Sequence, residues 1–179
     1  GYVPYLRAIL KKETKPSRVT WGAFVVGDVI LCASYYDSGA DITLWPIVTL
    51  AFGALLIFLT SILYGVKEVS KTDRVCIGLI ALNIGIVFIN YNMNAVLIIS
   101  CITFFIGIIP TYKKAFRDPS SESKIGRSIF ALASLLNVVA IDNWQSWQIA
   151  IVPIAVMVTN LPTALMLIFP RSWRKNEAI

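Results

Sequence analysis

Residues 43–66 read TLWPIVTLAFGALLIFLTSILYGV, an apolar stretch without a charged side chain. A helix needs about 20 mostly apolar residues to cross the hydrocarbon core of a bilayer, so this stretch predicts a membrane-spanning helix. The chain of 179 residues is 57% hydrophobic and only 15% charged. Soluble domains carry about 25% charged residues, and a soluble core of this size could not cover so much apolar surface. The sequence therefore indicates an integral membrane protein, with the lipid bilayer as its main partner.

On either side of this stretch, five further apolar runs have a length near that of a membrane span. Residues 1–10 look like the end of one more helix, which we expect to be truncated at its N-terminus. The sequence thus predicts an all-α fold with seven transmembrane helices, the last six over residues 19–36, 43–66, 74–90, 93–112, 126–141 and 146–169.

The basic residues occupy alternate gaps between these runs. The intervening gaps hold Asp37, Asp41 and Asp142 instead. Because Lys and Arg mark the cytoplasmic side of membrane proteins, we expect a cytoplasmic C-terminus, in what we take to be a bacterial cytoplasmic membrane. The sixteen basic residues are Arg7, Lys11, Lys12, Lys15, Arg18, Lys67, Lys71, Arg74, Lys113, Lys114, Arg117, Lys124, Arg127, Arg171, Arg174 and Lys175.

Several classes of function are disfavoured by composition. The net charge of +6 lies in short gaps between apolar runs, so no nucleic-acid partner is expected. The chain has no His, and its three Cys are widely spaced within apolar runs, so we expect neither a metal nor another cofactor. No nucleophile stands beside an evident base, so we do not expect an enzyme.

An internal repeat relates the two ends of the chain. A constant shift lays Gly1 on Gly107, Pro4 on Pro110 and Arg7 on Lys113. Each copy contains three spans, and one span separates the copies, so the copies have the same orientation and form parallel repeats. We expect a first three-helix bundle at 1–66, a linker helix at 67–92, a second bundle at 93–170 and a cytoplasmic tail at 171–179.

This arrangement resembles the SWEET and PQ-loop superfamily, and in particular small bacterial membrane proteins. The motifs that carry the resemblance are Gly1-Tyr2-Val3-Pro4-Tyr5 and residues 14–21, TKPSRVTW. The second copy reads Pro110-Thr111 followed by residues 118–123, DPSSES; the Pro-Gln pair itself reads Pro4-Tyr5 and Pro110-Thr111 here. The resemblance implies transport by two helix bundles, with an Asn of the last helix, here Asn160, in contact with the solute.

Asp28 is the acidic residue nearest the middle of a predicted span. Intramembrane acids are costly and are usually functional, so Asp28 is a candidate to contact the solute or to bind a cation or coupling proton. The alternative is an Asp hydrogen-bonded within the bundle. Its stripe of small and polar residues, which includes Ser34 and Tyr35, should face other helices or a cavity.

A second polar group lies in the last span, where Thr159, Asn160 and Thr163 flank Pro162. Pro162 cannot donate to the carbonyl of Val158, which loosens the backbone at a depth where transporter sites occur. Hydrogen bonding between helices is the alternative interpretation for these side chains.

The remaining candidate solute-binding residues are Asn83 in the linker helix, and Ser134 with Asn137 on one stripe of the sixth helix. Packing between helices is the alternative for these three. Pro4 and Pro110 are candidate hinges at the inner gate, together with Pro162, or they only shape helix ends.

The sequence leads to two hypotheses of function. The first is a transporter or facilitator of a small polar solute, sugar-like or another small metabolite, that works by alternating access between two helix bundles. The second is a scaffold or accessory subunit that docks a partner or anionic lipid through its basic cytoplasmic loops. The sequence leaves open whether the protein acts as a monomer or a homo-oligomer.

Overall fold

The structure, a computed structural model, describes residues 2–12, 16–65, 69, 71–89, 92–117 and 124–169, without the side chains at 8, 20, 72, 110, 111, 113, 114 and 117. This part of the chain contains seven α-helices and one short 3-10 helix (η1), and no β-strand. The elements are α1 (Tyr2–Leu10), α2 (Arg18–Asp37), η1 (Ile42–Leu44), α3 (Trp45–Tyr64), α4 (Lys71–Ile89), α5 (Met93–Arg117), α6 (Lys124–Val139) and α7 (Trp147–Ile168).

The expected all-α fold is confirmed, and each predicted run corresponds to one α-helix, although the run 43–66 begins in η1 and the run 126–141 extends past the end of α6. Two of the helical segments, Ile42–Tyr64 and Trp147–Ile168, are long and apolar enough to cross a membrane. A third apolar segment, Met93–Ile109, is shorter. Proline marks the start of α3, where Pro46 occupies the first turn and needs no hydrogen-bond partner for its nitrogen.

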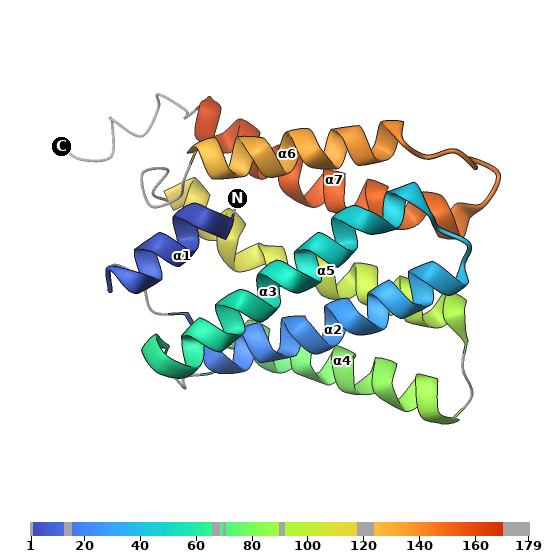
Figure 1. Cartoon of the computed structure of the whole chain (residues 1–179), viewed down its shortest axis with the longest axis horizontal. Helices are drawn as coiled ribbons and strands as arrows, with labels where there is room; N and C mark the ends of the chain where they lie inside the picture. The colour runs from blue at the N-terminus through green and yellow to red at the C-terminus, as the bar shows by residue number, and fades with distance from the viewer. Residues whose placement is uncertain are drawn as a thin grey trace.

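The helices lie side by side along the long axis of the molecule (Figure 1). The turn between α2 and α3 and the connection between α6 and α7 lie at one end, and the first residues of α2 and α6 lie at the other. Gly39 makes the first of these turns possible, because its φ of 86° is in the left-handed region that favours glycine.

The helices of each predicted repeat pair in the same way. In the first triplet, α1 and α2 both pack on α3; in the second, α5 and α6 both pack on α7. The triplets meet mainly where α2 packs on α5, and α4 packs on both α2 and α5.

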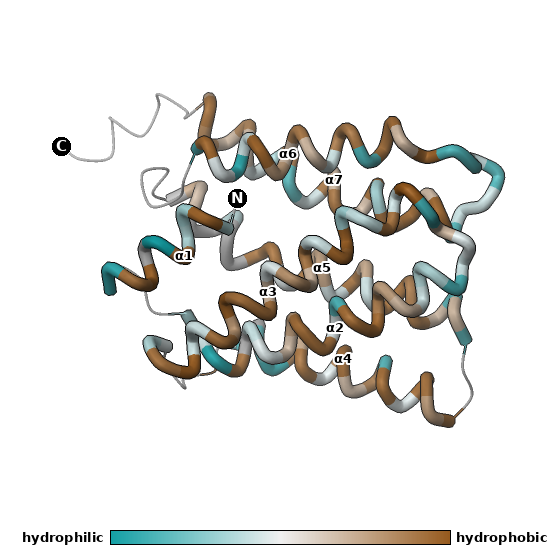
Figure 2. The backbone as a smooth tube through the Cα atoms, in the orientation of Figure 1, coloured by the Kyte–Doolittle hydropathy of each residue, from teal (hydrophilic) through white to brown (hydrophobic). Residues whose placement is uncertain are grey.

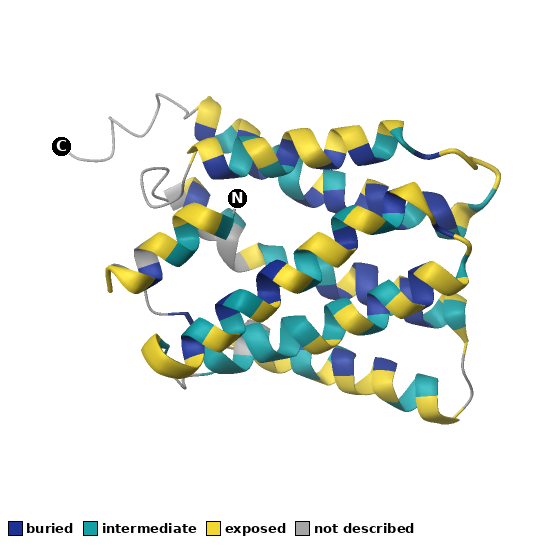
Figure 3. Ribbon diagram, viewed as in Figure 1, coloured by how far each residue is buried: buried dark blue, intermediate teal, exposed yellow. Residues whose placement is uncertain are grey.

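Apolar residues recur along every helix (Figure 2), and exposed and buried positions alternate along the helices (Figure 3). Phe88, Ile89 and Val139 have exposed fractions of 84%, 88% and 81%. Polar side chains are buried instead, namely Ser34, Thr43, Ser61, Asn83, Ser100, Thr103, Ser134, Asn137, Thr159 and Thr163. A protein folded in water rarely exposes so many large apolar side chains together.

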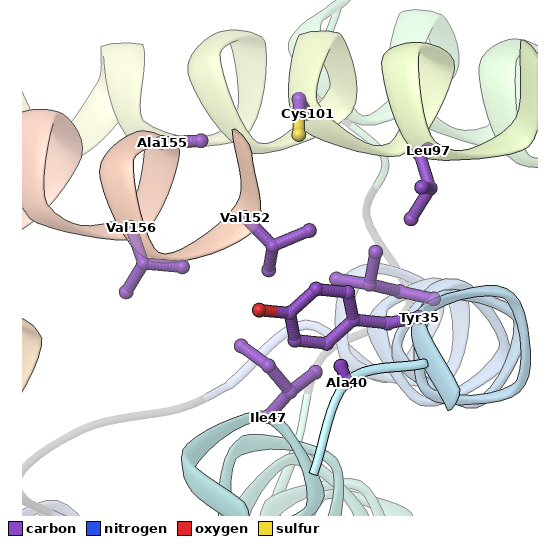
Figure 4. Packing of buried hydrophobic residues seen from close by; sticks show 9 residues of the cluster. Tyr35, Ala40, Ile47, Leu97, Cys101, Val152, Ala155 and Val156 are labelled. Carbon is purple, nitrogen blue, oxygen red and sulfur yellow. The ribbon is translucent and has the colours of Figure 1, made fainter. Parts of the chain in front are cut away.

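The main apolar core lies where α2, α3, α5 and α7 meet (Figure 4). Tyr35 is at its centre, fully buried, and its ring lies between Ile47 and Val152. Leu97 and Cys101 of α5 close the cluster on another side. Because these residues come from both triplets, the core joins the two halves of the chain.

The opposite end of the first triplet is tied by a basic side chain. Arg18, at the start of α2, donates from Nε to the Ser61 carbonyl near the end of α3 (3.0 Å), and the Gly65 amide donates to the same oxygen (2.7 Å). A side chain at Gly65 would overlap the Pro16 carbonyl, so the close approach of these segments requires glycine.

Candidate functional site

Asp28 lies in the middle of α2, at a half-buried position. It makes no hydrogen bond within the described part of the chain, and it interacts electrostatically with the Tyr2 hydroxyl and with the Cys32 thiol one turn further along α2. The predicted stripe is half-buried at Gly27 and buried at Ser34 and Tyr35, so it does face other helices.

Tyr2 holds the position where both triplets come together around Asp28. Its hydroxyl donates to the Leu50 carbonyl of α3 (3.2 Å), and its ring lies directly over Gly53. The same ring meets Phe130 of α6 edge-on, with centroids 5.4 Å apart. Arg127, also on α6, acts electrostatically on the Tyr2 hydroxyl. Asp28 of α2 and Arg127 of α6 thus both act electrostatically on the Tyr2 hydroxyl of α1.

The polar group of α7 is largely satisfied by its own helix. Thr159 donates to the carbonyls of Ala155 and Val156 (both 2.9 Å), and Thr163 donates to that of Thr159 (3.1 Å). The amide of half-buried Asn160 donates to the Val156 carbonyl (2.8 Å). The hydroxyl protons of both threonines and the amide of Asn160 are therefore used within α7.

A buried hydrogen-bond network lies at the end of the molecule where α2 turns into α3. The Tyr35 hydroxyl donates to the Ile149 carbonyl of α7 (2.6 Å) and accepts from the Thr43 hydroxyl (2.8 Å). The Asn137 amide of α6 donates to the Thr43 carbonyl (3.4 Å). The network links α2 and η1 of the first triplet to α6 and α7 of the second.

Two of the predicted residues bond away from these groups. Ser134 donates to the Ala131 carbonyl of its own helix (2.8 Å). Asn83 donates to Ser100 Oγ (3.0 Å) and so joins α4 to α5. Both are buried, as the packing interpretation expects.

The predicted hinge prolines have different settings. Pro4 lies in the first turn of α1, and Pro162 lies inside α7. The side chain of Pro110 is outside the described residues, although its backbone continues α5.

The structure distributes the predicted site residues over four places and does not bring them into one cluster. Asp28 lies beside Tyr2, Asn160 lies on α7, Asn137 belongs to the network around Tyr35, and Asn83 lies against α5. No hydrogen bond between described residues connects Asp28 to Asn160. Any solute that touches both would have to span the space between α2 and α7.

Sequence reasoning missed the tyrosines that organise these places, Tyr2 and Tyr112, and the partners Thr43 and Arg127. Tyrosine is common in membrane proteins as an interfacial anchor, so its presence alone does not indicate a site. The available signal was the proline content of α7, since a proline leaves a carbonyl that needs a donor from elsewhere.

Among the described residues, no group of three or more Cys, Asp or Glu side chains lies together as a metal site would require. Comparisons with protein-family models, with curated proteins and with solved structures find no match for this chain. The site must therefore be interpreted from its own residues.

Proposed function

We propose that this protein is embedded in a membrane through seven helices and carries a small polar solute between its two helix triplets. The observation that carries the proposal is Asp28, a half-buried acid in the middle of α2 that acts electrostatically on Tyr2, the residue through which α1 contacts α3 and α6. An ionisable group in such surroundings is costly, and function is the usual reason that one is present.

The exposed surface supports the membrane part of the proposal. Large apolar side chains cover the outside of the helices, and those of α4 and α6 are as exposed as those of α3 and α7. In water such a surface would drive aggregation, whereas in lipid it is the favourable solvent contact. The acids Asp41 and Asp142 and the exposed indoles of Trp45 and Trp144 gather at one end of the helices.

The matching helix pairings support the transport part. Since α1 and α2 pack on α3 as α5 and α6 pack on α7, each triplet has the contacts of a unit that can move as one body. Rocking of such units about a central site is how repeat-built transporters alternate access. Tyr2 contacts α3 of its own unit and α6 of the other, so its surroundings, and the electrostatic effects of Asp28 and Arg127 on it, would change with every cycle.

Uptake into liposomes containing purified protein tests the proposal. We expect uptake of at least one radiolabelled probe from a panel of glucose, sucrose, alanine and arginine, above that of protein-free liposomes. Asp28→Asn should reduce uptake at least tenfold, and Asn160→Ala should raise the solute concentration needed for half-maximal uptake. Asp142→Asn, which changes an exposed acid at a helix end, is the matched control.

Wild-type uptake by both Asp28→Asn and Asn160→Ala, for every probe that is carried, would remove these residues from the site. A scaffold would give a different pattern, with no uptake of any probe and loss of a bound partner when Lys113, Lys114 and Arg117 are reversed in charge. Their side chains are outside the described residues, so the structure offers no particular support for docking through them.

A further inference from the structure

Two prolines lie inside α7, and each leaves one backbone carbonyl without its helical donor. Proline has no N–H, so Pro153 cannot bond to the Ile149 carbonyl and Pro162 cannot bond to the Val158 carbonyl. In an apolar environment a carbonyl without a donor is strongly unfavourable, so each must be satisfied from outside the helix or the helix will deform.

Both carbonyls receive a tyrosine hydroxyl from another helix. Tyr35 of α2 donates to the Ile149 oxygen (2.6 Å). Tyr112 of α5 donates to the Val158 oxygen (3.2 Å) and to the adjacent Thr159 oxygen (2.9 Å). The two tyrosines belong to different triplets, and their target carbonyls are nine residues apart on one helix (158 − 149 = 9). At Pro153 a hydroxyl therefore supplies the donor that the backbone lacks; at Pro162 the single proton of Tyr112 does so in part, because it is shared with the Thr159 carbonyl.

We propose that at each proline of α7 a tyrosine hydroxyl takes the place of the missing backbone donor, and that Tyr112 positions Asn160 in this way. We refer to each such proline with its tyrosine hydroxyl as a joint, and to α7 as a jointed helix. Asn160 lies between the carbonyls that Tyr112 contacts and Pro162 itself, so the backbone that carries Asn160 is fixed by this contact. The Asn160 amide is bonded to the Val156 carbonyl one turn earlier, so the direction of its acceptor oxygen follows that of the backbone.

The two joints differ in what they hold. The Tyr35 contact crosses between the triplets and is part of the fully buried network with Thr43. The Tyr112 contact lies within the second triplet, between two helices that already pack together. Relative movement of the triplets would strain the first contact and leave the second intact, so Asn160 would keep its orientation through the movement.

Double-mutant cycles test the joints without any assumption about function. Tyr112→Phe removes only the hydroxyl, and we expect it to lower the melting temperature of the purified protein by roughly 2 °C, the shift usual for one hydrogen bond in a chain of this size. Pro162→Ala restores the missing N–H, so in that background Tyr112→Phe should lower the melting temperature by less than it does alone, and the remaining loss reflects its bond to the Thr159 carbonyl. Tyr35→Phe should likewise cost less in the Pro153→Ala background, where the contact of its hydroxyl with Thr43 is the part that is still lost.

Tyr36→Phe is the control, since Tyr36 is adjacent to Tyr35 and exposed. It should leave the melting temperature unchanged with or without Pro153→Ala. Additive effects in both proline–tyrosine cycles would overturn the jointed-helix proposal, because they would mean that the hydroxyls do not replace the proline N–H.

The positioning of Asn160 rests on the proposed function and needs an uptake measurement. Tyr112→Phe should raise the KM for the carried probe several-fold with little change in maximal rate, and it should add nothing further in the Asn160→Ala background. Independent effects on KM would remove the positioning role. A wild-type protein that carries no probe would instead contradict the proposed function, while the melting cycles would still decide the joints.

Discussion

At the scale of single residues, burial of a polar side chain is favourable only where its polar atoms are hydrogen-bonded. Asn83 shows both sides of this rule. Its amide donates to Ser100, whereas its carbonyl oxygen is the one buried side-chain polar atom without a partner in the part of the chain that the structure describes. An unpartnered buried acceptor costs about 1–3 kcal/mol, so this contact is close to neutral overall.

Substitutions at Asn83 and Ser100 separate the gain from their hydrogen bond from the cost of the unpartnered Asn83 oxygen. Ser100→Ala should destabilise the protein by about 1 kcal/mol, because it leaves both ends of the Asn83 side chain unbonded. Asn83→Leu should cost less than Ser100→Ala, and adding Ser100→Ala to it should cost little more, since no buried amide then remains. Unfolding in SDS measures the three free energies; a larger loss for Asn83→Leu than for Ser100→Ala would contradict the account.

Gly53 is the residue on which the placement of Tyr2 depends. A Cβ at this position would overlap the Tyr2 ring, whereas a Cβ at Gly85 of α4 would meet no atom within 4 Å. Gly53→Ala should therefore weaken the packing of α1 on α3 and lower the melting temperature. Gly85→Ala is the matched control and should raise it slightly, because alanine is better than glycine in a helix by about 1 kcal/mol.

A second substitution tests whether the Tyr2 ring causes the loss of stability expected for Gly53→Ala. In a Tyr2→Ala background, where the ring is absent, Gly53→Ala should no longer lower the melting temperature. Persistence of the loss would show that the strain comes from another neighbour of Gly53.

At the scale of the elements, helix ends are held by contacts from other segments. The end of α3 is an example, because the Ser61 carbonyl accepts from both Arg18 and the Gly65 amide. The positive charge of Arg18 also lies at the C-terminal end of that helix, where the helix dipole favours a cation. One side chain thus fixes where α2 begins relative to where α3 ends.

Loss of this contact should be measurable. Arg18→Ala should destabilise the protein by about 1–2 kcal/mol, the range for a hydrogen bond from a charged donor. Arg18→Lys should recover part of the loss, since it retains the charge near the helix end. Lys71→Ala, an exposed basic residue at the start of α4, is the control and should change stability by less than about 0.5 kcal/mol.

At the scale of the whole molecule, the charged ends of the helices separate into two groups. Asp41 and Asn143 lie at the end with the exposed indoles, and Lys71 and Lys124 lie at the other end. Lys and Arg usually lie on the cytoplasmic side of a membrane. If the end with Lys71 and Lys124 is cytoplasmic, the end with Asp41 and Asn143 must face the other side of the membrane.

Cysteine labelling tests this orientation. In a background with Cys32, Cys76 and Cys101 changed to Ala, a single Cys at Asp41 or Asn143 should react with an impermeant maleimide in intact cells. A single Cys at Lys71 or Lys124 should react only after the membrane is made permeable. Labelling of all four positions in intact cells would contradict the one-sided topology.

The helical class and the approximate bounds of each helix follow from the order of the amino acids alone. Apolar runs of sufficient length interrupted by charge leave the backbone few alternatives, so the run 19–36 corresponds to α2 (Arg18–Asp37) and 146–169 to α7 (Trp147–Ile168). Proline chemistry is equally local, because Pro162 frees the Val158 carbonyl wherever the helix lies in the fold.

Which side chains meet depends instead on the packing of the helices. The donor to the Val158 carbonyl is Tyr112, 46 residues away, and the donor to the Ile149 carbonyl is Tyr35, 114 residues away. Hydrogen bonds of this kind depend on how helices cross and rotate, and those angles arise from contacts between side chains distant in the sequence. For the same reason, Asp28 and Asn160 stand out in the sequence as polar residues in apolar runs, but their separate surroundings are set by the tertiary structure.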